Sequence, residues 1–190
     1  MAQQTLLQAS VGTSSLWVKA LAVLGGSAVI ALGAQVSVPM LPVPMTLQTL
    51  AILMVGLTAG SRLGAAAVVA YLVQGAMGLP VFANGMAGLP VLMGPTGGFL
   101  IGFIALAFAA GWLVERGLAR GFLTTALGMA AISLLLYVPG VAWLTAITPL
   151  DLNGAMAAGM VPFVPGDMVK SLVAALAVTG AWAALRARRG

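Results

Sequence analysis

Long apolar stretches, separated by short segments rich in glycine, proline or charge, divide the chain. Within each stretch the apolar residues run on without the strict alternation that is typical of strands in a membrane barrel. A helix needs about 20 such residues to cross the hydrocarbon core of a bilayer. The pattern therefore predicts an all-α integral membrane protein in which residues 1–190 form one transmembrane domain with six helical spans. We expect the spans at residues 16–37, 46–60, 63–77, 98–114, 121–139 and 166–185.

The composition narrows the possible functions. Of the 190 residues, 62% are hydrophobic and 6% are charged, which is unlike any soluble domain of this size. The chain contains neither cysteine nor histidine, so disulfides, thiol nucleophiles and Ser-His-Asp catalysis are excluded. The three carboxylates, Glu115, Asp151 and Asp167, are too few for a multi-carboxylate metal site. We therefore predict no enzyme, no metal site and no cofactor.

The basic residues sort to one side of the predicted spans. In a soluble protein the net charge of +5 would suggest a nucleic-acid partner, but here these residues lie at the ends of spans, so none is expected. Seven of the eight fall on one side, which the positive-inside rule makes cytoplasmic. We therefore expect a multi-pass protein of the bacterial inner membrane with both termini in the cytoplasm. The seven are Lys19, Arg62, Arg116, Arg120, Arg186, Arg188 and Arg189.

Lys170 is the exception, since it falls on the outer side, three residues after Asp167. This spacing puts both side chains on one face of the first turn of the last span, where they touch or share a ligand. Inserting such charges costs about 2.5–3.5 kcal/mol each unless they are paired or solvated. We interpret the pair as part of a ligand site. The alternative is that Asp167 caps the helix while Lys170 extends to the lipid headgroups.

Two unusual loops are expected on the same outer side. Residues 38–45 contain three prolines, and residues 78–98 contain six glycines and three prolines interleaved with large apolar residues. The second loop is too apolar to lie in water, so we predict a lid or a cavity wall, the alternative being a passive connector. Its one strongly polar side chain is Asn84.

The remaining candidate residues would complete a pocket. Gln48 stands at the polar start of the short second span, and it either faces a cavity or makes a hydrogen bond between helices. Phe82 and Tyr71 could supply apolar walls. The expected ligand is small, partly apolar, and anionic or amide-like at its polar ends.

Small residues recur four positions apart in the first span. This spacing lets a second helix approach closely, either within the chain or as a docking face for another subunit. The residues concerned are Ala22, Gly26, Ser27 and Ala31.

Four motifs together resemble the BioY family, the biotin-specific S components of energy-coupling-factor (ECF) transporters. They are residues 42–49 (PVPMTLQT), 78–83 (GLPVFA), 94–99 (GPTGGF) and 165–170 (PGDMVK). The resemblance covers nearly the whole chain from the first span onward. It implies a six-helix S-component bundle that holds biotin near the outer surface, under the loop between the first two spans.

The resemblance also implies roles for residues and partners. Asn84, Asp167 and Lys170 would contact biotin, with Asn84 and Asp167 suited to the ureido ring. Lys170 would either meet the biotin carboxylate or hold Asp167 in place. The partners would be a transmembrane coupling protein and two cytoplasmic ATPases. S components of the family dock through small residues of their first span, which makes Ala22, Gly26, Ser27 and Ala31 candidates here.

The leading hypothesis is therefore capture of biotin at the outer face for ATP-driven import. The phosphate-loop pattern fails, because Val169 and not glycine precedes Lys170, so energy must come from another subunit. The alternatives are a stand-alone transporter or channel for another small solute, and a scaffold without a ligand. A channel would carry polar residues along several spans, whereas this chain is polar only at their ends.

Overall fold

A computed structural model describes residues 5–10, 15–119 and 121–187. The regular secondary structure of the described part is helical except for one short hairpin, β1 (Ser37–Val38) and β2 (Met45–Thr46). A short 3-10 helix, η1, covers Ala83–Gly85. The α-helices are α1 (Leu6–Ser10), α2 (Leu16–Gln35), α3 (Gln48–Ala59), α4 (Ser61–Ala76), α5 (Leu89–Met93), α6 (Gly97–Glu115), α7 (Phe122–Ile147), α8 (Leu152–Gly159) and α9 (Val164–Ala187).

Four of these helices, α2, α6, α7 and α9, are long and apolar enough to cross a membrane. The predicted class, an all-α membrane protein, is confirmed at this level. The second and third predicted stretches form α3 and α4, which have 12 and 16 residues. They are shorter than the roughly 20 residues that a helix normally needs to cross the hydrocarbon core.

Helix α7, which corresponds to the fifth predicted span, is longer than the sequence predicts. We expected a span that ends at residue 139, because Pro139 cannot donate a backbone hydrogen bond. Instead α7 continues to Ile147 with Pro139 inside it. The reason is packing against α6, where Gly98 and Gly102 leave room: a Cβ atom on Gly98 would lie 2.3 Å from Trp143, and one on Gly102 would lie 3.0 Å from Pro139.

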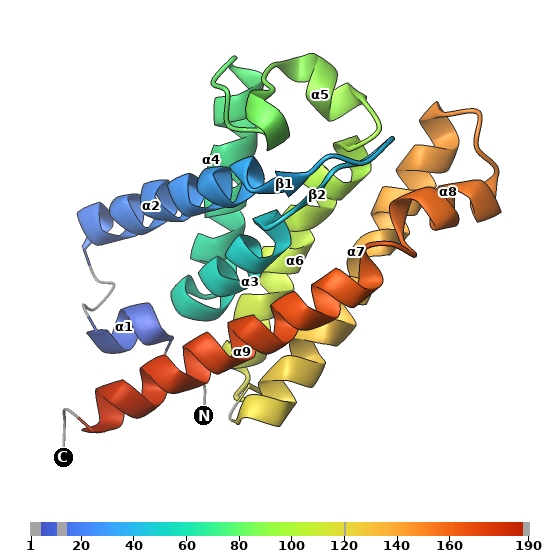
Figure 1. The fold of residues 1–190 in the computed structure, drawn as a ribbon. Helices are drawn as coiled ribbons and strands as arrows, with labels where there is room; N and C mark the ends of the chain where they lie inside the picture. The colour runs from blue at the N-terminus through green and yellow to red at the C-terminus, as the bar shows by residue number, and fades with distance from the viewer. Residues whose placement is uncertain (1–4, 11–14, 120, 188–190) are drawn as a thin grey trace.

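Helix α6 lies at the centre and contacts α3, α4 and α7. Helix α9 packs on α7 and α3, and α2 packs on α4 and α3, so that α3 has neighbours on several sides (Figure 1). The backbones of α3 and α6 meet at Gly56, where a Cβ atom would lie 2.6 Å from the carbonyl oxygen of Ala107. Such close approach fixes α3 against the central helix.

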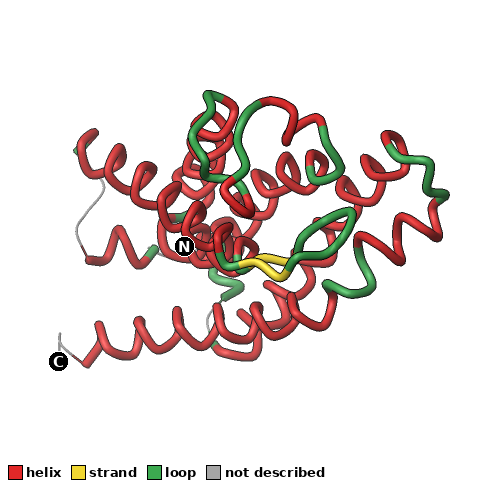
Figure 2. The backbone as a smooth tube through the Cα atoms, turned by 45° about the horizontal axis from the view of Figure 1, so that its top comes forward, coloured by secondary structure: helices red, strands yellow, loops and turns green. Residues whose placement is uncertain are grey.

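The connections that carry the hairpin, α5 and α8 gather at one end of the bundle. Figure 1 shows the β1–β2 hairpin, α5 and α8 toward the upper right, and α1 and the end of α9 toward the lower left. The hairpin joins α2 to α3 and lies across the helices (Figure 2). Lys19, Arg62 and Arg116 stand near the start of α2, the start of α4 and the end of α6. Three other residues used for the orientation, Arg120, Arg188 and Arg189, lie outside the described residues.

At the end opposite the hairpin, Glu115 ties α6 to α4. Its carboxylate accepts hydrogen bonds from the Ser61 backbone N–H (2.8 Å) and from the Ser61 hydroxyl (2.7 Å). A carboxylate at the first turn of a helix also complements the helix dipole. The turn between α3 and α4 is thereby anchored to the end of α6.

Candidate functional site

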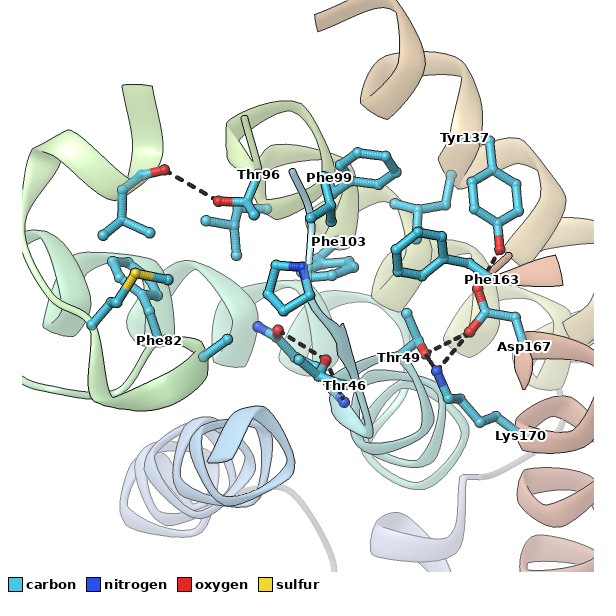
Figure 3. Close-up of a pocket in the computed structure, with 18 residues that line it drawn as sticks. Thr46, Thr49, Phe82, Thr96, Phe99, Phe103, Tyr137, Phe163, Asp167 and Lys170 are labelled. Atoms are coloured by element: carbon cyan, nitrogen blue, oxygen red, sulfur yellow. Dashed lines mark hydrogen bonds and ion pairs between the residues drawn. The ribbon is translucent and has the colours of Figure 1, made fainter. Parts of the chain in front are cut away.

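The first turn of α9 carries a buried ion pair. Lys170 Nζ lies 2.9 Å from Asp167 Oδ1, and the two residues are 8% and 3% exposed. Thr49 of α3 donates to the same Asp167 oxygen (2.9 Å) and accepts from Lys170 (3.0 Å). Tyr137 of α7 donates to Asp167 Oδ2 (2.6 Å), so both carboxylate oxygens are hydrogen-bonded (Figure 3).

This network explains how two charges stay buried. Asp167 and Lys170 neutralise each other, and the hydroxyls of Thr49 and Tyr137 replace hydrogen bonds that water would make. The expected contact between Asp167 and Lys170 is present. Lys170 lies inside the bundle, bonded to Asp167 and Thr49, and does not extend to the headgroups as the alternative required.

A largely apolar pocket opens beside this pair. Phe99 and Phe103 of α6 line it between the ion pair and Phe82, which lies at the far side (Figure 3). Val43 and Pro44 of the hairpin loop form another wall. The space measures about 610 Å³ when the open solvent at its mouth is included, and most of its lining residues are apolar. The arrangement can hold an apolar body and bind one polar end.

Gln48 and Tyr71 are brought together, but only Gln48 lines the pocket. Its side-chain amide donates to the Tyr71 hydroxyl (2.8 Å). Tyr71 is fully buried behind the wall and meets the ring of Phe82 edge to face, with centroids 5.5 Å apart. Tyr71 therefore supports Phe82 and Gln48 from behind.

Asn84 stands apart from the ion pair. It is exposed, has a positive φ of 58°, and accepts a hydrogen bond from the Ser37 hydroxyl at Oδ1 (2.6 Å). It lines a second hollow, of about 1390 Å³ including open solvent, between the hairpin loop and α5. This second hollow adjoins the pocket, with which it shares Pro44, Met86, Val91 and Thr96.

Two of the four small residues of the first span are used within the chain. A Cβ atom on Gly26 would lie 2.9 Å from Ala67 of α4, and the Ser27 hydroxyl lies 3.1 Å from the amide nitrogen of Gln74, which donates to it. For Gly26 and Ser27, the small residues therefore serve packing within the chain, which was one of the two alternatives that the sequence allowed. Ala31 is half-buried against the hydrophobic core, and Ala22 is half-buried as well.

The sequence model of the BioY family matches residues 4–187 of this chain. The chain belongs to the BioY family. This confirms the resemblance read from the four motifs, and a member of this family is a transport protein and not an enzyme.

Individual relatives support this family assignment. The biotin transporter BioY of Thermotoga maritima is 43% identical over 150 residues, which cover 79% of this chain and 87% of that protein. The biotin transporter BioY of Rhizobium etli is 38% identical over 151 residues, covering 74% and 79%. The crystal structure of the S component for biotin from an ECF-type ABC transporter matches with a TM-score of 0.74 over 94% of this chain and 96% of that one, at 24% identity. The fold is thus that of an S component.

Several residues of the BioY pocket were not singled out from the sequence. Tyr137 carries a signal that could have been used, because it is one of only two tyrosines and lies in an apolar span near its expected outer end. Thr49 follows Gln48 directly and shares its helical turn. Phe99 stands out in the sequence only as the last residue of the 94–99 motif. Phe103 carries no local signal, since a phenylalanine in an apolar span is ordinary, and Phe163 lies in the connection before the last predicted span.

Proposed function

We propose that this protein captures biotin at the outer face of the bacterial inner membrane for ATP-driven import. Residues 1–190 would form one substrate-binding domain, and the ECF partners would be a transmembrane coupling protein and two cytoplasmic ATPases. The observation that carries the proposal is a buried ion pair of zero net charge, in which both Asp167 oxygens accept hydrogen bonds, at one end of an aromatic pocket. Membership of the BioY family and the names of its relatives support it.

The pocket suits the chemistry of biotin. The ureido ring has two N–H donors and a carbonyl acceptor, and the Asp167 carboxylate and the Gln48 amide offer complementary groups at the pocket wall. The sulphur-containing ring and the alkyl chain would lie against Phe99 and Phe103. By the resemblance to the BioY family, Asn84 would be a further contact that reaches the ligand from the second hollow.

The proposal includes six membrane spans with both termini in the cytoplasm. Helices α3 and α4 would then be the two short spans, and the hairpin would face outward with the pocket beneath it. The four long apolar helices and the S-component fold support this arrangement. Ala22 and Ala31, which are only half-buried on α2, remain candidates for the docking face of the coupling protein.

Calorimetric titration of the purified protein tests the proposal. We expect saturable binding of biotin and none of thiamin or riboflavin. Asp167→Asn should weaken biotin binding at least tenfold, or by about 1.4 kcal/mol. Asp151→Asn is the matched control, because Asp151 is exposed and caps α8 away from the pocket. Absence of biotin binding would overturn the proposal.

A second measurement tests the requirement for partners. Uptake of radiolabelled biotin should depend on co-expression of the coupling protein and both ATPases. Uptake at the full rate without them would favour a stand-alone transporter.

A further inference from the structure

The two ends of the pocket differ in charge and access. At one end the positive charge of Lys170 is already neutralised by Asp167, at 2.9 Å, and both groups are buried. At the other end the pocket continues into the second hollow through Met86, Val91 and Thr96. Figure 3 shows Thr96 and Phe82 on the side away from Asp167 and Lys170.

This charge distribution determines which end of an elongated acid can lie at the ion pair. A ligand carboxylate placed there would put two anions beside one buried cation, which is strongly unfavourable. A neutral group with N–H donors meets no such penalty. The carboxylate of a biotin-like ligand therefore belongs at the end that opens into the second hollow.

The second hollow offers the carboxylate water and no counter-ion. No charged side chain is among the described residues that line it. It is also open, since Leu41 in its wall is 95% exposed. A carboxylate and a neutral amide therefore meet nearly the same surroundings there, and the hollow leaves room for a substituent beyond them.

On the basis of the biotin-binding function proposed above, we propose that the site also accepts biotin derivatives extended at the carboxyl group. The ligand class is biotin amides, with biotinyl-lysine as the representative member. The ureido ring lies at Asp167, and the amide and its substituent lie in the second hollow.

Competition for labelled biotin on the full-length purified protein tests this inference. Biotinamide and biotinyl-lysine should bind within about threefold of biotin, whereas a biotin methylated on its ureido nitrogen should bind at least thirtyfold more weakly. If biotin binds and biotinamide is thirtyfold weaker or worse, this inference is wrong while the proposed function stands. If biotin itself does not bind, both are wrong.

A pair of charge variants at Leu41 locates the carboxylate independently. Because Leu41 is exposed, Leu41→Lys and Leu41→Glu should both fold, and Leu41→Gln is the neutral control. At low ionic strength we expect the lysine variant to bind biotin about threefold more tightly than the glutamate variant, and both to bind biotinamide equally. Equal binding of biotin by the two variants would overturn the inference.

Discussion

The two sides of the pocket are built in different ways. The side at Asp167 is made of helix residues: Thr49 from α3, Tyr137 from α7 and the ion pair from α9, all buried and mutually bonded. The side at Asn84 is made of the hairpin loop and the segment between α4 and α6, and Asn84 itself is exposed. The helices hold buried polar groups against one another, whereas the loops form the solvent-exposed part of the wall. The two sides therefore differ in burial and in the number of polar contacts.

The largest effect should come from breaking the ion pair. Lys170→Met leaves the Asp167 carboxylate buried without a counter-ion, which costs about 3–5 kcal/mol of folding stability. We expect a large fall in the thermal unfolding temperature in detergent and loss of biotin binding. The double variant Asp167→Asn with Lys170→Met should regain most of the stability and none of the binding. A stable single variant would show that the pair is not buried.

Removing the Tyr137 hydroxyl should have the next largest effect. Tyr137→Phe deletes the 2.6 Å hydrogen bond to Asp167 Oδ2, and a hydrogen bond to a charged group contributes about 1.5–3 kcal/mol. Biotin affinity measured by calorimetry should fall about tenfold to a hundredfold. Ser133→Ala on the same helix is the control, because the Ser133 hydroxyl is buried and finds no hydrogen-bond partner among the described residues. An equal effect of both variants would contradict the assigned role of Tyr137.

A methyl group at Gly75 should disturb the loop side through Phe82. A Cβ atom there would lie 2.1 Å from the Phe82 ring, so Gly75→Ala must push this ring toward the pocket. Overpacking of this kind costs about 1–3 kcal/mol, and biotin affinity should fall with stability. Gly180→Ala on α9 is the control, since a Cβ atom there meets nothing within 4 Å. Unchanged affinity in Gly75→Ala would mean that Phe82 does not shape the site.

The smallest effect is expected at Asn84. Asn84→Gly keeps the backbone free to adopt the φ of 58° and removes the side-chain amide. The loss of one exposed hydrogen bond, about 0.5–1.5 kcal/mol, should weaken biotin binding by about tenfold at most. Ser37→Ala, which removes the partner of Asn84, should have less effect still. A hundredfold loss in Asn84→Gly would show that Asn84 moves into the pocket when the ligand binds.

The sequence was most informative where the signal is local. Uninterrupted apolar runs located a helix at each of the six predicted stretches, and the spacing of Asp167 and Lys170 gave their contact. It was least informative where proximity depends on tertiary packing. Thr49 and Asp167 are 118 residues apart, and no pattern along the chain links them.

Two other details also depend on packing. The persistence of α7 past Pro139 depends on glycines in α6, a different helix. The separation of Asn84 from the ion pair depends on the path of the loop that follows α4, which glycine and proline make possible but do not specify.

Helix α3 runs from the pocket to the opposite end of the bundle. It starts at Gln48 in the pocket and ends at Ala59, and at about 1.5 Å per residue its 12 residues form a rod of roughly 18 Å. Gly56 holds the rod against α6, and the turn that follows it is tied to Glu115. Gln48 and Thr49 therefore stand on a helix whose far end is held by two contacts, which restrains the part of the pocket wall that they form.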